Sequence, residues 1–118
     1  MMHTKEEIDK LAMEFEQCRK ILVALGDENR QHMILEMMKM GDCSGVRVNK
    51  ITEKTHLSRP TVSHHLQILK DAGILKMRRE ATKNYYYFDP DMKSFEMLIG
   101  ILQKAIRITS ELPDRSCN

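Results

Sequence analysis

The chain has 118 residues, which is enough for one domain with a small hydrophobic core. Its three cysteines are odd in number and lack CxxC spacing, so a disulfide scaffold is excluded. The net charge is +2, and no run approaches the roughly 18 apolar residues that cross a membrane. Because the N-terminus is polar and has no apolar signal core, we expect a cytoplasmic protein without membrane association.

The positive charge is concentrated in one segment. Residues 47–85 hold nine Lys or Arg against three acidic residues, a net +6, whereas the rest of the chain holds ten against fourteen, a net −4. This asymmetry is typical of a nucleic-acid-binding surface. A solvated basic face without a partner has the same composition, so the interpretation depends on the motif within the segment.

The first expected helix covers residues 5–24. Its apolar residues alternate steps of three and four, which is the spacing of a seam between helices. These residues are Ile8, Leu11, Phe15, Cys18, Leu22 and Leu25. We expect Cys18 to be a small buried group of this seam.

Gly26 ends this helix, and Asp27 is expected to cap the next one, over residues 28–40. The side chains expected to face inward are Met33, Ile34, Met37 and Met38. Methionines 33, 37, 38 and 40 could instead suggest copper(I), but methionines at helical spacing are far more often core filler. A glycine-rich loop then leads to a short helix ending near residue 55. Its expected cap is Asn49, with Ile51 and the stem of Lys54 over the core.

Residues 57–75 predict the second helix of a helix-turn-helix followed by a strand. Ser58 is a good N-cap, and Pro60 lies in the first turn, where its missing N–H costs nothing. Val62, Leu66 and Leu69 form one buried stripe. Gly73 is expected to end the helix in the left-handed conformation.

The outward face of this helix carries hydrogen-bonding side chains and no carboxylate before Asp71. With Ser58 at the start, these are Arg59, Thr61, Ser63, His64, Gln67 and Lys70. Such a face suits base edges and phosphates, so we expect it to contact DNA. His64 is expected to contact a base or phosphate rather than to be an idle surface histidine. His65 lies against either the wing or the core, and two adjacent histidines cannot chelate one ion from one helix face.

A wing and a closing helix follow. Residues 74–79 and 84–88 are short extended runs joined by a hairpin loop at 80–83. Arg78, Arg79 and Lys83 lie at its base and tip, where a wing touches DNA. A last helix over about 91–111 has an apolar face formed by Phe95, Leu98, Ile99, Leu102, Ala105 and Ile106.

The first and last helices are both amphipathic, and one small core cannot cover both. We therefore expect a homodimer, although the two helices could instead cover each other within one chain. The expected interface residues are Ile8, Leu11, Phe15, Cys18, Leu22, Phe95, Leu98, Leu102 and Ile106. The expected fold is mostly α with a small two-stranded β wing, a winged helix-turn-helix in the order α-α-α-α-β-β-α. Residues 1–118 then form a single domain, with dimerisation helices at about 5–24 and 91–111.

Three segments in this order resemble the ArsR/SmtB family of bacterial winged-helix repressors. They are LGDENR at 25–30, LSRPTVSHHL at 57–66 and ILKDAGIL at 68–75, followed by a tyrosine-rich second wing strand. The resemblance covers about residues 15–112. It implies a homodimeric transcriptional repressor whose hold on a double-stranded DNA operator is loosened by an effector.

The resemblance also implies metal sites, for which the ligands are missing. The family's metal sensors carry two cysteines where this chain has Arg47 and Asn49, and neither is a soft ligand. The second family site falls near Pro90, Met92, Gln103 and Ile106. We therefore expect no metal and no cofactor, and the small effector stays unidentified. Cys43 or Cys117 could be a redox-reactive thiol, but incidental cysteines are favoured because no neighbouring cation or partner thiol is visible.

An enzyme is not expected, because the sequence has no GxSxG, P-loop, HExxH or carboxylate pair. The expected function is sequence-specific DNA binding by a transcriptional regulator, with a homodimeric repressor released by an unidentified effector favoured and an activator left open. The alternative is a winged-helix module that docks other proteins without sequence-specific DNA binding. A docking helix would expose an apolar ridge, whereas residues 59–70 expose polar side chains.

Overall fold

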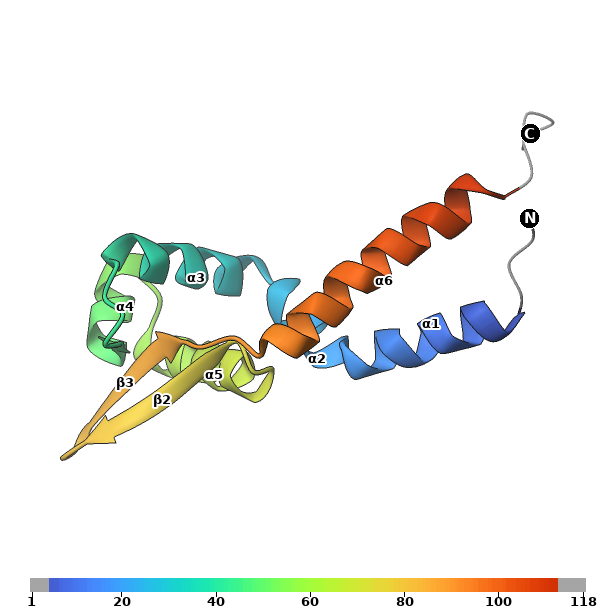
Figure 1. Cartoon of the computed structure of the whole chain (residues 1–118). Helices are drawn as coiled ribbons and strands as arrows, with labels where there is room; N and C mark the ends of the chain where they lie inside the picture. Colours follow the sequence, from blue (N-terminus) through green and yellow to red (C-terminus); the bar gives the residue numbers. More distant parts are fainter. Residues whose placement is uncertain (1–4, 113–118) are drawn as a thin grey trace. The chain divides into compact units, whose positions relative to one another are not determined.

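The computed structural model describes residues 5–112 as six helices and three short strands (Figure 1). These elements belong to two compact units. One unit is the continuous segment Lys20–Asp91, and the other contains the first and last helices of the chain. None of the described helices is long and apolar enough to cross a membrane.

The central unit is a winged helix-turn-helix, as predicted. Its elements in order are α2 (Arg19–Leu25), α3 (Glu28–Met40), β1 (Val46–Arg47), α4 (Val48–Thr55), α5 (Arg59–Asp71), β2 (Leu75–Glu80) and β3 (Lys83–Phe88). Its core is formed by apolar side chains of the helices together with Val46 and Leu75, at the starts of β1 and β2. The side chains with no exposed surface include Ala24, Met33, Ile51, Val62, Leu66 and Leu69. The apolar stripe predicted for the second helix of the motif is therefore confirmed.

Local capping chemistry sets the helix boundaries. The Asp27 side chain accepts from the Arg30 amide at 3.1 Å, and the Ser58 hydroxyl accepts from the Thr61 amide at 3.3 Å. After α5, Gly73 has a φ of 79°, which lets its amide donate to the Lys70 carbonyl at 3.0 Å and so closes the helix. All three predicted boundaries are confirmed.

The expectations for α4 and for one residue of α3 were partly wrong. Helix α4 begins at Val48, one residue before the expected cap Asn49, and Arg47 at the N-cap makes no capping side-chain bond. Lys54 is exposed, and Thr55 is buried instead. Thr55 can be buried because its hydroxyl donates a hydrogen bond to the Ile51 carbonyl at 2.7 Å. On α3, Met38 is exposed rather than facing inward, whereas Met33, Ile34 and Met37 are buried as predicted, and Arg30 is buried beside them.

The sheet has three antiparallel strands in the order β1-β3-β2, one more than the predicted two-stranded wing. The added strand β1 pairs Val46 with Tyr86 and Arg47 with Tyr85. It can approach β3 because of Gly45, where an added Cβ would lie 2.9 Å from the Tyr85 Cβ, and where φ is 115°. A two-residue strand has no periodicity to read in a sequence.

The other unit contains α1 (Lys5–Gln17) and α6 (Met92–Ser110). The prediction of one continuous helix over 5–24 was wrong, because the helix is interrupted by a turn at Cys18, between α1 and α2. Cys18 is buried, and its thiol lies 3.8 Å from the Ser94 carbonyl of α6. Burial, and secondarily the Glu14 carboxylate, raises the pKa of this thiol, so it stays protonated.

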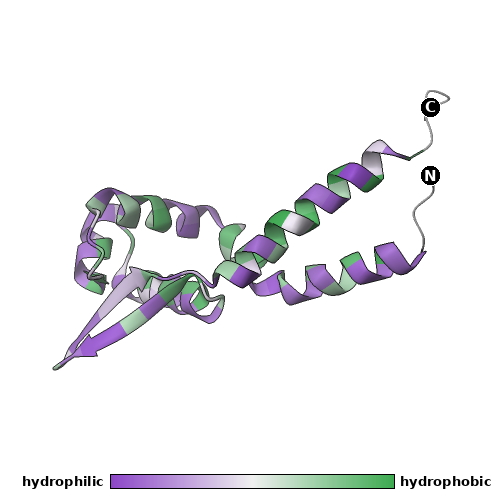
Figure 2. Ribbon diagram, viewed as in Figure 1, coloured by the Kyte–Doolittle hydropathy of each residue, from purple (hydrophilic) through white to green (hydrophobic). Residues whose placement is uncertain are grey.

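Helix α6 has two apolar faces. Ile101 and Ile108, neither of which was predicted to be buried, are the buried residues of this helix. Leu102 and Ile106, which the sequence placed on the apolar face, are 53% and 68% exposed. Apolar residues recur along the whole of α6 (Figure 2). The two end helices therefore do pack on each other within one chain, but this contact leaves a second apolar face exposed.

Candidate nucleic-acid interface

Helix α5 presents the predicted polar row to solvent. Ser58, Arg59, Ser63, His64, Gln67 and Lys70 are exposed, and Thr61 is half-buried. The side chains of Ser63, His64 and Lys70 make no hydrogen bond or ion pair with the described residues 5–112. Their donors and acceptors are therefore available to a ligand along most of the length of the helix.

Other members of the row already have partners. Ser58 donates through its hydroxyl to the Thr61 hydroxyl oxygen at 2.8 Å, so both residues stabilise the first turn. The Gln67 amide donates to the Asp71 carboxylate at 2.8 Å, one helical turn further on. A base edge would therefore have to compete with the Asp71 carboxylate for the Gln67 amide.

His65 points into the core, one of the two placements that the sequence left open. It is only 7% exposed, and its Nδ1 lies 3.2 Å from an Nη atom of Arg30, which is buried to the same degree. The same guanidinium donates to the carbonyls of Ala24 at 2.8 Å and Val23 at 3.0 Å, at the end of α2. Because a guanidinium only donates, His65 must be neutral here, with its proton on Nε2.

The buried histidine makes stability depend on pH. Burial chiefly lowers the pKa of His65, with contributions from the Arg30 and His64 charges, while Asp27 opposes the shift. A lowered folded-state pKa means that the contribution to stability is complete above the ordinary value of about 6.5. It is lost as the pH falls below that value and through the folded-state pKa. We therefore expect the free energy of unfolding to decrease between pH 7 and pH 5.

His65→Asn should flatten this part of the pH profile, because an asparagine Oδ1 can accept from Arg30 but does not titrate. His64→Asn is the matched control, since His64 is exposed on the same helix, and it should leave the slope unchanged. Urea unfolding at fixed protein concentration and several pH values measures both. A wild-type slope that persists in His65→Asn would contradict the assignment.

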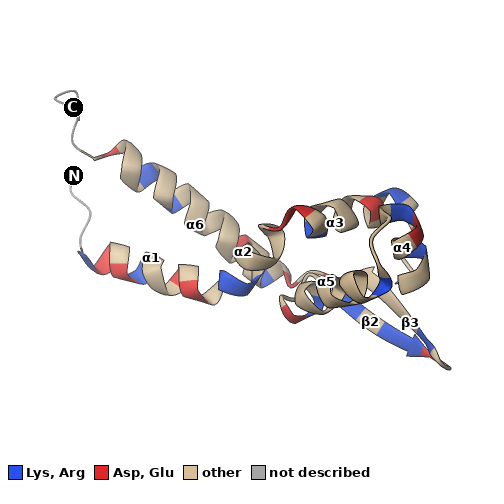
Figure 3. Ribbon diagram, turned by 180° about the vertical axis from the view of Figure 1, so that it is seen from behind, with Lys and Arg blue, Asp and Glu red and all other residues tan. Residues whose placement is uncertain are grey.

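The wing is basic, but its cations differ in availability. Arg78 donates to Glu80 at 2.9 Å and lies over the Tyr85 ring, 5.0 Å from its centroid, so it is held within the sheet. Arg79 is exposed, and among the described residues its side chain donates only to the Ala81 carbonyl, at 3.2 Å. Lys83 is exposed at the start of β3 and makes no ion pair with the described part of the chain. Figure 3 shows Lys and Arg on α4 and along the hairpin.

A small polar hollow lies where α4, α5 and the hairpin meet. It has a volume of about 70 Å³, and its lining includes Arg47, Asn49, Arg59, Lys83 and Asn84. Arg59 donates to the Asn49 side chain, which connects the two helices of the motif. Sequence reasoning placed Arg59 and Lys83 at the interface but missed Arg47, Asn49 and Asn84. The one available signal was the position of Arg47 and Asn49 within the basic segment 47–85.

No group of three or more His, Cys, Asp or Glu residues within 5–112 is arranged to hold a metal ion. Arg47 lies in β1 and Asn49 in α4, while Met92, Gln103 and Ile106 lie in α6. Pro90 precedes α6. Cys43 is exposed in the loop after α3, and Cys117 lies outside the described residues.

Comparison with known proteins agrees with this architecture. Residues 27–76 match the family model described as bacterial regulatory protein, arsR family. The chain is 42% identical over 77 residues to an uncharacterized HTH-type transcriptional regulator of Methanocaldococcus jannaschii, covering 65% of this chain and 83% of that protein. It is 35% identical over 66 residues to the transcriptional repressor SdpR of Bacillus subtilis, covering 56% and 69%.

Among solved structures, the chain resembles the homodimeric winged helix-turn-helix DNA-binding domain of a possible ArsR-family regulator from Mycobacterium bovis. The TM-score is 0.57 at 20% identity, with 96% of this chain and 97% of that chain covered. At this identity the likeness concerns the fold. Together with the family model and the relative of which the chain covers 83%, it shows that the chain belongs to the ArsR family of transcriptional regulators.

Proposed function

We propose that this ArsR-family regulator is a homodimeric repressor that binds a specific operator and is released by a small effector. Membership of the family makes the chain a transcriptional regulator with a winged helix-turn-helix DNA-binding domain, and not an enzyme. The observation that carries the proposal is the row of hydrogen-bonding side chains on the outward face of α5, of which Ser63, His64 and Lys70 have no partner within residues 5–112. The Bacillus subtilis relative is named a transcriptional repressor, which supports repression rather than activation for this chain.

In the proposed mechanism, α5 enters the major groove and its polar row reads base edges. Ser63, His64 and Gln67 are the central members of that row, and a bidentate side-chain contact discriminates bases by hydrogen-bond pattern. Arg79 and Lys83 of the hairpin lie along the flanking backbone or minor groove. They supply attraction that does not depend on sequence.

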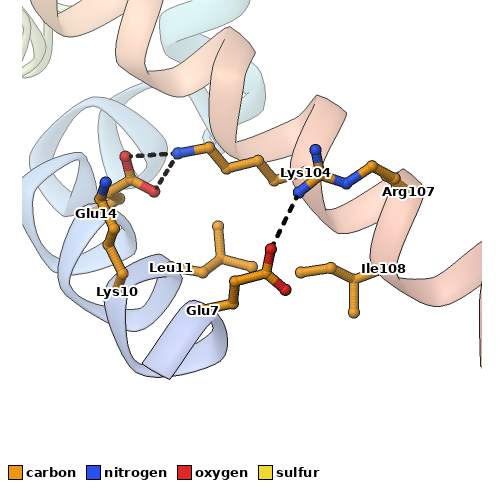
Figure 4. Close-up of a pocket in the computed structure, with 7 residues that line it drawn as sticks. All are labelled: Glu7, Lys10, Leu11, Glu14, Lys104, Arg107 and Ile108. Carbon is orange, nitrogen blue, oxygen red and sulfur yellow. Dashed lines mark hydrogen bonds and ion pairs between the residues drawn. The ribbon is translucent and has the colours of Figure 1, made fainter. Parts of the chain in front are cut away.

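The end helices are proposed to form the dimer. Their exposed apolar residues include Ile8, Phe15, Leu102 and Ile106, and exposed apolar side chains gathered on one pair of helices commonly mark a protein–protein interface. Leu11 and Ile108 meet between α1 and α6, where ion pairs join Lys104 to Glu14 at 2.9 Å and Arg107 to Glu7 at 3.8 Å (Figure 4). These pairs flank a hollow of about 140 Å³ and stabilise the two helices as one scaffold for a second copy.

The alternative function is a docking module without sequence-specific DNA binding. A docking surface on α5 would be apolar, yet the described exposed face of α5 has no large apolar side chain. The exposed apolar surface of the end helices instead suits a second copy of the chain. The arrangement therefore favours DNA as the ligand of α5.

The two kinds of contact should separate in binding experiments. Ser63→Ala and Gln67→Ala should each weaken binding to the preferred operator by about 1–3 kcal/mol and affect random duplex much less. Arg79→Ala should weaken binding to all sequences alike and lower the steepness of the salt dependence by about 0.9 per half-site. The operator would be selected from a random duplex pool, and affinities for operator and scrambled duplex measured across a salt series.

Glu28→Ala provides a control for nonspecific surface effects, because Glu28 is exposed in the first turn of α3. The roles are reversed if the hairpin variant loses specificity while the α5 variants lose only overall affinity. Wild-type protein that binds operator no better than scrambled duplex would contradict sequence-specific recognition and favour the docking module.

A further inference from the structure

We propose that the hollow between α4, α5 and the hairpin is a binding site for one backbone phosphate of the DNA duplex. The inference rests on the proposed function and assigns a role to Arg47, Arg59, Lys83 and Asn84 as a unit. Arg59 is then a phosphate-binding residue rather than a reader of base edges.

The charge of the hollow is uncompensated. Arg47, Arg59 and Lys83 all line it, and none of the three forms an ion pair with a carboxylate of residues 5–112. Other cations of the same unit are paired, such as Lys76 with Asp89 at 2.7 Å and Arg78 with Glu80 at 2.9 Å. Three cations that converge without an acid repel one another, so the site is arranged for an external anion.

The position of the hollow matches the path of the DNA backbone. If α5 lies in the major groove and the hairpin in the adjacent minor groove, the sugar-phosphate strand that separates the two grooves must pass between them. Arg59 comes from the first residue of α5, and Lys83 from the first residue of β3. The hollow therefore lies between the two elements that would straddle this strand.

The cationic side chains are held by ordered backbone. Arg47 belongs to β1 and is paired with Tyr85 of β3, and the Asn49 side chain accepts a hydrogen bond from Arg59. A site that is already assembled loses little conformational entropy when a ligand binds. A flexible lysine on a loop would not have this advantage.

Asn84 adds a polar group at the same place. It lines the hollow, its Oδ1 is fully buried, and that oxygen has no hydrogen-bond partner among the described residues. A buried polar atom without a partner costs free energy, and rotation of the amide exchanges Oδ1 for a donating Nδ2. A bound phosphate would provide the acceptor that this donor needs.

Neutralisation of single phosphates tests the inference. A series of operator duplexes would each carry one methylphosphonate in place of a backbone phosphate. One position should weaken wild-type binding about tenfold, and at that position Arg47→Gln should add little further loss, because the two changes remove the same contact. Arg19→Gln is the matched control, since the Arg19 side chain is 71% exposed and outside the hollow. The affinity of Arg19→Gln relative to that of the wild type should be the same for every duplex of the series, so the variant keeps the wild-type loss at the one sensitive position.

Asn84→Asp separates a binding role from a structural role. The new carboxylate would occupy the anion's place among three cations, so DNA affinity should fall at least about tenfold while the melting temperature stays the same or rises. Asn84→Ala should lower affinity less. Loss of melting temperature together with affinity in Asn84→Asp would show that the cluster only supports the fold, and would overturn the inference.

The outcomes also distinguish the inference from the proposed function. If Arg47→Gln behaves like Arg19→Gln at every methylphosphonate position while Ser63→Ala still loses operator preference, the phosphate site is wrong and the function stands. If inorganic phosphate at millimolar concentration protects the hollow from hydrogen exchange and DNA does not, the ligand is a free phosphate group. That result would equally overturn a DNA backbone site.

Discussion

Leu102→Asp is expected to convert the protein from a dimer to a monomer at micromolar concentration and to weaken operator binding at least about a hundredfold. The Leu102 side chain is 53% exposed in one copy of the chain, on the face of α6 that does not contain the buried Ile101. In a two-fold dimer the substitution buries two carboxylates without partners, which costs several kcal/mol. The monomer then contacts a single half-site, so specific affinity falls towards the nonspecific level.

Sedimentation equilibrium and operator titration would measure both effects, and Phe15→Asp should act in the same direction from α1. Leu35→Asp is the matched control because Leu35 is an exposed leucine, 56% accessible, on α3. It should remain dimeric and bind normally. A wild-type protein that sediments as a monomer at high concentration would contradict the dimer and the two-half-site model together.

Arg30→Met is expected to lower the free energy of unfolding by about 2–3 kcal/mol, with a fall in melting temperature of roughly 10 °C. The change leaves the carbonyls of Ala24 and Val23, and the Nδ1 of His65, without the donors that they have in the native protein. Removing one partner of a buried hydrogen bond exposes the full desolvation cost of the other. Helix α2 would lose its main polar connection to α3 and α5.

Thermal and urea unfolding at one fixed protomer concentration would measure this effect, since the proposed dimerisation would make the melting temperature depend on protein concentration. Arg19→Met removes an exposed guanidinium and should change stability by less than about 0.5 kcal/mol. Arg30→Lys should lie between the two, because an ammonium supplies fewer donors in a less favourable geometry. Equal stability of Arg30→Met and the wild type would show that water replaces the guanidinium.

The sequence predicted those parts of the fold that have a local cause. Asp27, Ser58 and Gly73 were identified correctly as helix boundaries because capping and left-handed conformations depend on the residue itself and its near neighbours. The break at Cys18 was missed because no glycine or proline marks it. Strand β1 was missed because its two residues are paired by a tertiary contact with Tyr85 and Tyr86.

The candidate site shows the same division. The exposed row on α5 could be predicted because the helical periodicity of Val62, Leu66 and Leu69 identifies the buried face, and the polar row lies on the opposite face. Arg47 and Asn84 were not identified, because their proximity to Arg59 depends on how the sheet packs beside the helices. Arg30 was noted only as part of a motif, since a buried arginine is indistinguishable in sequence from a surface one.

The way β1 and β2 join their neighbouring helices has a consequence for motion. Strand β1 ends at Arg47 and α4 begins at Val48, while only three residues separate α5 from β2. Because β1 also pairs with β3, these short junctions should restrict the swing of the hairpin relative to the helix-turn-helix, and we expect the two to move largely together. If the protein binds an operator of imperfect geometry as proposed, we expect the adjustment to come mainly from bending or twisting of the duplex. Operator flexibility outside the contacted bases should therefore contribute to selectivity.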